Sequence, residues 1–337
     1  MAESRGSQAQ PDSHAGSSLR QAVYVVRSHD GHAHARYDEI TREDPLEIRV
    51  HARWLPTDAN GPEAASDRPR VPEERALSVT LRTPAVDDVF SGPEQPGPFA
   101  GARRADCELA LGYLFSEGLL TCRADVVSLR SPDPNVVVVT LRPSRPVPWR
   151  SVERTGVTSS ACGLCGKTSL AALSAYRAAA PAPAAIALPA LAPGDIAALP
   201  KKLSAAQPIF ARTGGLHAAA LFDWQGTLIA VREDIGRHNA VDKLLGSQIL
   251  AAPDAQAPLR LFQHILLVSG RAGYELVQKA RMASLPLFVA VGAPSSLAVQ
   301  LAHDAGMSLI AFCRPGQFNV YSAPDRIALQ PVPREGA

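Results

Sequence analysis

The residues best suited to chemistry in this chain are two cysteines that stand three positions apart, Cys162 and Cys165. A glycine follows each cysteine, and Lys167 comes two residues after the second. Glycine-bordered cysteines can occupy an exposed loop, and a nearby ammonium group favours the thiolate over the thiol. A thiolate attacks sulfur or binds metal, so the pair is consistent with zinc binding, dithiol–disulfide exchange or the carriage of sulfur as a persulfide.

The rest of the sequence gives two of these chemistries less support. A structural zinc site usually has four ligands, and the chain has no second Cys-x-x-Cys pair, although His217 and His238 could complete a site. A zinc deaminase would place proline before the first cysteine, where this chain has Ala161. A thioredoxin-type pair directly follows a strand. Here the pair lies between two expected domains, which suits an arm that carries a group from one partner to another.

Residues suited to anions follow three expected strands, at 265–269, 287–291 and 309–312. Glycine lets backbone N–H groups approach a ligand, the start of a helix favours negative charge, and arginine adds paired donors. Ligands bind at the carboxyl ends of strands in open α/β sheets, so we expect a phosphate-bearing ligand such as a nucleotide at this edge. The residues concerned are Ser269, Gly270, Arg271, Ser295, Ser296, Cys313, Arg314, Pro315, Gly316 and Gln317.

Taken singly, each of these loops is better explained as an ordinary strand–helix turn, whereas the three together favour a binding site. None has a Gly-x-Gly-x-x-Gly or Walker pattern. A second group of reactive side chains surrounds an expected hairpin at 216–231. His217 and His238 bracket this hairpin and could transfer protons or position a thiol. An ion-pair cluster at the start of the following helix would account equally well for Glu233, Asp234 and Arg237.

Other polar and sulfur-bearing residues are expected to be structural. Asp242 and Lys243 are interpreted as a solvated face of a helix. Cys107, Cys122 and Cys313 are expected to pack as small hydrophobic side chains, although Cys313 could also contact a ligand.

The apolar pattern predicts a small N-terminal α+β domain at 43–150. Its expected strands are 45–50, 77–84 and 136–141, and its expected helix is 108–118, closed by a glycine. Beyond this domain, 151–204 is interpreted as the cysteine loop, a short helix at 169–180 and an alanine- and proline-rich linker without a core of its own.

A layered α/β domain is expected at 205–325. Helices expected at 238–249, 274–283 and 295–305 alternate with strands, which predicts helices packed against a largely parallel sheet. The polar segment 1–42 is interpreted as a disordered tail and 326–337 as a second tail.

Composition narrows the function classes further. The chain has 337 residues, of which 46% are hydrophobic, so it can form about two domains with sizeable cores. A formal net charge of +2 gives no general reason to expect nucleic acid or a membrane as a partner. Five cysteines do not make a disulfide framework, and no signal peptide or apolar span is evident, so a cytoplasmic protein is expected.

Several blocks taken together resemble the formate dehydrogenase accessory sulfurtransferases, the FdhD family. The likeness covers most of 45–325, and long blocks in a fixed order make it far more specific than the cysteine pair alone. The blocks are LRTP (81–84), GYLFSEGL (112–119), SACGLCGK (160–167), TGGLHAA (213–219), REDIGRHNAVDK (232–243), SGRAGYELVQKA (269–280), APSSLA (293–298) and FNVY (318–321).

This resemblance implies a sulfur carrier that accepts sulfur from a cysteine desulfurase and passes it to the molybdenum cofactor, bis-molybdopterin guanine dinucleotide, before the cofactor enters formate dehydrogenase. It implies that Cys162 bears a persulfide and that Cys165 is its partner. It also implies a second domain similar in fold to cytidine deaminase without that enzyme's zinc ligands, and a homodimer. The segment implied to bind the cofactor is Phe312, Cys313, Arg314, Pro315, Gly316 and Gln317.

An alternative from another class is a chaperone that holds the molybdenum cofactor without handling sulfur. The segment before residue 43, the stretches at 56–75 and 85–104 and the alanine-rich linker are longer than the family leads us to expect. None of them touches a motif, so they bear on contacts with partners more than on the chemistry.

Overall fold

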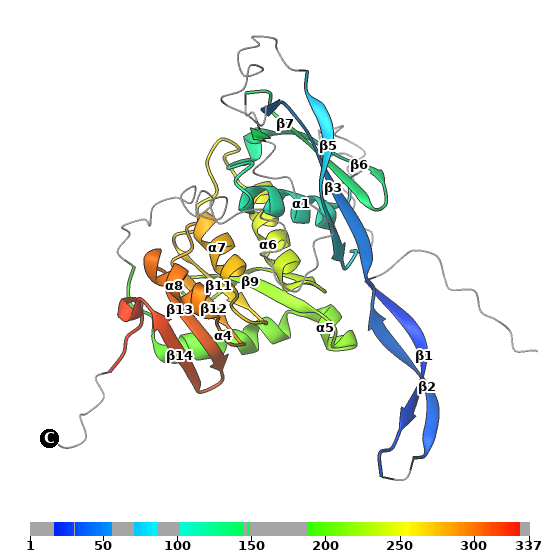
Figure 1. The fold of residues 1–337 in the computed structure, drawn as a ribbon. Helices are drawn as coiled ribbons and strands as arrows, with labels where there is room; N and C mark the ends of the chain where they lie inside the picture. The colour runs from blue at the N-terminus through cyan, green and yellow to red at the C-terminus, as the bar shows by residue number, and fades with distance from the viewer. Residues whose placement is uncertain are drawn as a thin grey trace, which may run out of the picture.

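The computed structural model describes residues 17–29, 31–55, 71–85, 102–144, 147–148 and 188–330. Within these ranges the chain forms a small mixed unit of strands and one helix, a larger α/β unit, and a hairpin that projects from the body (Figure 1). The cysteine pair and the helix predicted at 169–180 lie outside the described residues.

The small unit is a four-stranded sheet with a helix packed on it. The strand order is β5-β3-β7-β6, and β3 runs antiparallel to β5 but parallel to β7. Buried side chains on alternate positions of β3 face α1, as expected for a sheet with one covered face. The elements are β3 (Asp44–Ala52), β5 (Glu73–Arg82), α1 (Arg104–Ser116), β6 (Val126–Asp133) and β7 (Val136–Leu141), with a backbone pair β4 (Trp54–Leu55) and β8 (Val147–Pro148) beside them.

The strands and helix predicted for this unit are confirmed, with shifted ends. Strand β5 begins four residues before the predicted start, and α1 begins four residues before its own. The glycine expected to close the helix is Gly118, which has a φ of 75°. Glycine suits this position because a left-handed backbone is strained for residues that carry a Cβ.

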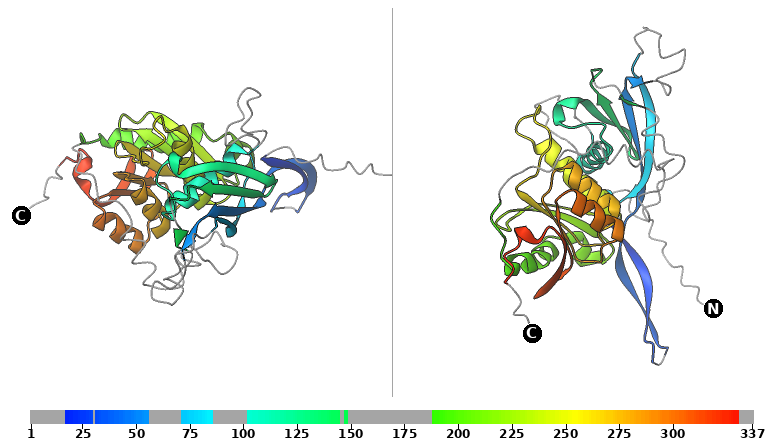
Figure 2. Two further views of the ribbon diagram at one scale, coloured as in Figure 1. Left: turned by 90° about the horizontal axis from the view of Figure 1, so that it is seen from above. Right: turned by 60° about the vertical axis from the view of Figure 1, so that its left-hand side comes forward.

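Residues expected to belong to a disordered tail form a two-stranded hairpin instead. Strands β1 (Ser18–Val26) and β2 (Ala33–Thr41) pair antiparallel along their whole length and point away from the body in both Figure 1 and Figure 2. Most of their side chains are exposed, including Tyr24 at 78% and Tyr37 at 69%. Because backbone pairing rather than a buried face holds the hairpin, the polar composition of this segment gave no signal for it.

The larger unit is built on a six-stranded sheet with the order β10-β9-β11-β12-β13-β14. Only the central strands β11, β12 and β13 are parallel to one another, while the flanking pairings are antiparallel. The prediction of a largely parallel sheet was therefore wrong, although the antiparallel hairpin of β9 and β10 was expected. A second hairpin, of β13 and β14, adds an antiparallel strand at the other side. The strands are β9 (His217–Asp223), β10 (Leu228–Asp234), β11 (His264–Val268), β12 (Leu287–Ala290), β13 (Ser308–Arg314) and β14 (Gln317–Ser322).

Helices cover both faces of this sheet. One face packs on α6 (Arg237–Ala251), α7 (Tyr274–Met282) and α8 (Ser296–Asp304), and these helices share a core with α1. The other face packs on α4 (Pro193–Ala205), which is followed by the short α5 (Pro208–Thr213). Short 3-10 turns occupy Arg123–Asp125 (η2) and Pro324–Arg326 (η3).

Helix α4 falls where a linker without a core was expected. Its residues Ile196, Leu199 and Leu203 are buried against the sheet, and Pro193 stands at its first position, where the ring is tolerated. Spacings of three and four residues are typical of an amphipathic helix. The surrounding alanines and prolines hid this pattern in the sequence.

Helices α1 and α6 join the two units by close backbone contact (Figure 1). A Cβ added at Gly112 would lie 1.8 Å from the carbonyl oxygen of Asp242, and one added at Gly246 would lie 1.8 Å from that of Glu108. Only glycine fits at either crossing. Arg232 of β10 also donates two hydrogen bonds to the buried Glu108 carboxylate, at 2.6 and 2.7 Å.

The expectation that Asp242 and Lys243 form a solvated face was wrong, because both are buried. Lys279 donates to both oxygens of Asp242, at 2.7 and 2.9 Å. Lys243 lies 2.6 Å from an oxygen of Asp234. Buried charges are stable only when paired, so these pairs tie α6 to α7 and to the end of β10. Among the helices of the described part, none is long and apolar enough to cross a membrane.

Candidate functional site

The three loops predicted to bind an anion lie side by side at one edge of the sheet. The backbone N–H of Gly292 donates to the carbonyl oxygen of Gly270 at 3.0 Å, and the N–H of Phe312 donates to the carbonyl oxygen of Gly292 at 3.1 Å. Residues Ala272 and Pro294 form a parallel bridge between the first two loops. The shared edge follows from the parallel strands β11, β12 and β13, whose carboxyl ends meet there.

The first loop is anchored to β9. Ser269 donates its N–H to the carbonyl oxygen of Ala218 at 3.0 Å, and its hydroxyl accepts from the N–H of Ala218 at 2.9 Å. The Arg271 side chain is exposed beside it. A fixed backbone with an exposed guanidinium is suited to an anion, because the donors need no reordering when the ligand arrives.

His217 belongs to this edge as well, which the sequence did not indicate. A Cβ added at Gly270 would lie 3.3 Å from His217 Nδ1 and 3.6 Å from the Cδ of Arg237, so the imidazole lies against the glycine backbone. Burial, followed by the charge of Arg237, lowers the pKa of His217, and Arg271 adds to this effect while Asp234 opposes it. The imidazole is therefore neutral at pH 7 and can both donate and accept a hydrogen bond.

The second loop needs its glycine. A Cβ added at Gly292 would lie 3.0 Å from the carbonyl oxygen of Gly270 and 3.1 Å from the Cα of Arg271, both closer than ordinary contacts. At the end of this loop Ser295 caps α8, where its hydroxyl accepts from the N–H of Ala298 at 3.3 Å. The capping expected of an ordinary turn is thus present, and Ser296 is the first residue of α8.

The third segment departs from the expected loop because β13 continues through Arg314. The register shifts between Ala311 and Arg314, and Phe312 adopts a φ of 52° with 44% of its surface exposed. A left-handed backbone is strained for a bulky residue, and such strain is common at functional sites. Pro315 and Gly316 then form the turn into β14, where Arg314 pairs with Gln317.

Cys313 points to the opposite face of the sheet. Its side chain is buried against α4, and its sulfur lies 3.6 Å from the carbonyl oxygen of Ile196. Burial raises the pKa of this thiol to about 11, so it is not a thiolate at neutral pH. The packing interpretation of Cys313 is confirmed, as it is for the buried Cys107 and Cys122.

Apolar side chains complete the edge. Three apolar residues lie here: Val291 directly after β12, Leu297 in the first turn of α8 and Phe312 in β13. Their exposed fractions are 38%, 54% and 44%. Exposed apolar surface beside guanidinium groups suits a ligand with both a flat apolar part and an anionic part. Their positions could be found in the sequence, but their exposure depends on the bulge in β13 and on the short β12.

Asp234 and Glu233, two of the remaining candidates, make structural contacts. Asp234 accepts hydrogen bonds from the N–H groups of Thr83 and Gly236, at 3.1 and 2.8 Å, in addition to its pair with Lys243. Glu233 accepts from two N–H groups at the start of α5. His238 faces Glu275 on α7 at 3.4 Å. Asp234 therefore forms the ion pair expected of this segment, whereas Glu233 binds backbone N–H groups of α5 instead.

The sequence is similar to a known protein family over most of its length. Residues 102–328 match the FdhD/NarQ family. The chain is 40% identical over 322 residues to the sulfur carrier protein FdhD of Streptomyces coelicolor, which covers 93% of this chain and 97% of that protein. It is 34% identical over 307 residues to the sulfur carrier protein FdhD of Sulfolobus acidocaldarius, which covers 91% of this chain and 98% of that protein.

A solved structure has a similar fold. It is described as a putative formate dehydrogenase accessory protein from Desulfotalea psychrophila, with a TM-score of 0.61 and 22% identity. The match covers 93% of this chain and 100% of that one. At this identity the likeness shows a shared fold.

Proposed function

Because this chain belongs to the FdhD/NarQ family, we propose that it is a sulfur carrier that serves the maturation of formate dehydrogenase. The observation that carries the proposal is the 40% identity, over 93% of the chain, to a protein named as a sulfur carrier. In this proposal Cys162 accepts sulfur from a cysteine desulfurase, and the acceptor of that sulfur is the molybdenum cofactor in its bis-guanine-dinucleotide form.

The two cysteines allow sulfur to be taken up and released with atoms and electrons in balance. The Cys162 thiolate attacks the outer sulfur of the desulfurase persulfide, and the desulfurase thiolate leaves, so that one sulfur atom moves without net oxidation. For release, the Cys165 thiolate attacks the inner sulfur of the Cys162 persulfide. A Cys162–Cys165 disulfide forms and sulfide departs toward the acceptor, after which a cellular thiol reductant restores both thiols. Lys167 favours the thiolate forms that these steps require.

The strand-end edge supports the second half of the proposal. Arg271 and Arg314 are exposed there, and their guanidinium groups match phosphate groups. Gly270 and Gly292 have no side chains, so the loops that contain them can bring backbone atoms close to a bound ligand. Phe312 exposes an aromatic ring on which a purine can stack. A cofactor that carries two guanine nucleotides has both kinds of group, so we assign its nucleotide end to this edge.

A chaperone that holds the cofactor without carrying sulfur is the competing function. Expressing the Cys162→Ala variant in cells that lack the native protein separates the two. A sulfur carrier without Cys162 leaves formate dehydrogenase inactive, whereas a pure chaperone still yields active enzyme. The matched control is Cys122→Ala, which removes a buried thiol of the first unit and should retain activity.

A further inference from the structure

His217 carries an imidazole that no hydrogen bond within the described part of the chain occupies. Neither ring nitrogen has a partner there, and neither is fully buried. The residue is the first of β9, is half-buried and lies beside the carboxyl end of β11. A polar ring at this depth has lost part of its contact with water, so its two nitrogens are suited to hydrogen bonds with a ligand.

The ring lies against the loop that begins the candidate site. A Cβ added at Gly270 would lie 3.3 Å from His217 Nδ1 and 3.4 Å from its Cε1. The next residue, Arg271, is exposed, forms no hydrogen bond or ion pair within the described residues, and is close enough for its charge to act on the imidazole. A guanidinium group matches phosphate oxygens, so a phosphate held by Arg271 would come to lie beside His217.

Two positive groups and one negative group act on this imidazole. Burial and then the charge of Arg237, on α6, lower the pKa of His217, Arg271 adds to this effect, and Asp234 on β10 opposes it. The Asp234 carboxylate is fully buried and lies 2.6 Å from the ammonium group of Lys243. Because this pair is internally neutral, Asp234 does little to repel an anion that approaches the ring.

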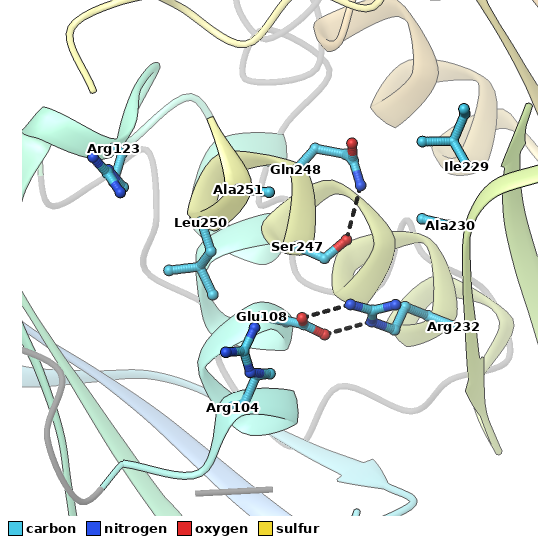
Figure 3. Close-up of a pocket in the computed structure, with 10 residues that line it drawn as sticks. All are labelled: Arg104, Glu108, Arg123, Ile229, Ala230, Arg232, Ser247, Gln248, Leu250 and Ala251. Carbon is cyan, nitrogen blue, oxygen red and sulfur yellow. Dashed lines mark hydrogen bonds and ion pairs between the residues drawn. The ribbon is translucent and has the colours of Figure 1, made fainter. Parts of the chain in front are cut away.

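The other charged groups of the neighbouring elements are engaged elsewhere. On β10, Arg232 donates two hydrogen bonds to Glu108 in a cavity lined by α1, β10 and α6 (Figure 3). Glu233 accepts from two N–H groups at the start of α5. On α6, His238 lies 3.4 Å from Glu275. The two arginines and Asp234 are therefore the charges that decide whether the imidazole binds a proton.

We propose that His217 contacts a phosphate of the bound nucleotide and takes up a proton as that phosphate binds. This rests on the proposed function, because it concerns the nucleotide end assigned to the strand-end edge. The phosphate supplies negative charge that offsets the two guanidinium groups, and the proton comes from the solvent. The imidazolium then donates a charge-assisted hydrogen bond to a phosphate oxygen, so His217 binds the ligand together with Arg271.

The direction of the pH effect follows from this proton. The free protein takes up a proton on His217 only below the ordinary value of about 6.5, whereas the complex takes it up at a higher pH. Affinity should therefore rise as the pH falls through the pKa of the complex, and should level off below the pKa of the free protein. At higher pH the ring is neutral in both states and binds as an uncharged donor.

GDP-mannose is the probe for this proposal. Both of its phosphates are esterified on two sides and keep their charge, whereas the terminal phosphate of GDP titrates near about pH 6. Calorimetric titration of the full chain should give an affinity at least about threefold higher at about pH 5.5 than at about pH 8. Titrations in buffers of different ionisation enthalpy should show proton uptake on binding, and the NMR midpoint of His217 should rise when the ligand saturates the protein.

Variants assign the proton to His217. His217→Gln keeps a hydrogen-bonding side chain that cannot be protonated, so its affinity should depend little on pH and its binding should take up no proton. His264→Gln is the matched control. Burial lowers the pKa of His264 as well, but this residue begins β11, at the opposite end of that strand from the site. The control should retain both the pH dependence and the proton uptake.

Three results would each overturn the role of His217: binding without proton uptake, pH dependence that persists in His217→Gln, or an NMR midpoint that the ligand does not raise. The NMR measurement uses the unmodified protein, so it remains decisive if the variant unfolds. Absence of any GDP-mannose binding would overturn this proposal together with the assignment of the nucleotide to the strand-end edge. The proposed sulfur transfer is measured separately, on Cys162.

Discussion

The N–H of Phe312 donates to the carbonyl oxygen of Gly292 at 3.1 Å, and through this bond the strained end of β13 is fixed to the loop after β12. The N–H of Gly292 makes the corresponding bond to Gly270, so three loops that are distant in sequence form one continuous rim. A shift in the middle loop must displace both neighbours. The rim therefore behaves as a single site.

Widening the middle of this rim should weaken nucleotide binding. In Gly292→Ala the new methyl group would lie 3.0 Å from the carbonyl oxygen of Gly270, so the loops must separate by a few tenths of an ångström. We expect the affinity for GDP, measured by calorimetry, to fall about tenfold, the loss of about one charged hydrogen bond. Gly273→Ala is the control, because a Cβ there meets nothing within 4 Å. Unchanged GDP affinity in Gly292→Ala would contradict the assignment of the rim.

The pKa of His217 depends on the charged residues around it and can be measured by NMR titration. Burial and the charges of Arg237 and Arg271 lower the pKa, so the NMR midpoint should lie below the ordinary value of about 6.5. Removing either positive charge should raise the midpoint, and Arg237→Gln should raise it more than Arg271→Gln. A midpoint that neither variant moves would show that His217 is not part of this edge.

The same shift predicts how stability depends on pH. The unfolded chain takes up a proton on His217 near pH 6.5, whereas the folded chain takes it up only at lower pH. The contribution of His217 to stability is therefore present above about pH 6.5, declines as the pH falls through that value, and becomes constant below the folded pKa. Urea unfolding should show that the stability of His217→Gln lacks this pH-dependent contribution. If stability depends on pH identically in the variant and in the unmodified protein, the contribution of His217 is excluded.

The crossing of α1 and α6 should tolerate no side chain at Gly112. A methyl group there would overlap the carbonyl oxygen of Asp242, so Gly112→Ala forces the helices apart and should cost several kcal/mol, as for other overpacked cores. Gly194→Ala in α4 is the matched control. A Cβ there has open space, so alanine should be neutral or slightly stabilising. Urea unfolding measures both, and equal midpoints would refute the close crossing.

The buried pair Asp242–Lys279 should be costly to break. Burial already raises the pKa of Asp242, and Lys279 opposes that rise, so Lys279→Met leaves a carboxylate without its cation. We expect a loss of about 3–5 kcal/mol at pH 7. Because the folded pKa then lies further above the unfolded value near 3.9, the loss should grow as the pH rises from 5 to 7.

Urea unfolding of the double variant Asp242→Asn/Lys279→Met tests this reasoning. The double variant removes both charges, so it should be more stable than Lys279→Met at pH 7 and should lose the added pH dependence. The single variant Asp242→Asn is measured as well. If the stability losses of Asp242→Asn and Lys279→Met add up to the loss of the double variant, the two residues are not coupled.

The sequence predicted elements whose apolar pattern is strong. The β-branched run Val136–Leu141 and the strands β11, β12 and β13 carry their burial in their composition, and the shared edge of their loops followed from parallel pairing. The charged pairs of α6 were not predictable in this way. Asp242 and Lys243 look like surface residues because their partners lie on other elements, 37 residues away for Lys279.

The site was predicted only in part for the same reason. Arg271 and Arg314 could be predicted from their residue type and from their place at the ends of strands. The role of His217 depends on the contact of its ring with Gly270, which no local pattern encodes. The exposed, strained Phe312 depends on a register shift between β13 and β14.

The persulfide itself is the most direct test of the proposed function. The protein is incubated with a cysteine desulfurase and cysteine, and intact-mass and peptide mass spectrometry then locate any added sulfur. We expect one additional sulfur atom on Cys162, removable by a thiol reductant and absent from Cys162→Ala. If no labile sulfur appears on Cys162 or Cys165 while the desulfurase is active, this chain does not carry sulfur by the proposed route.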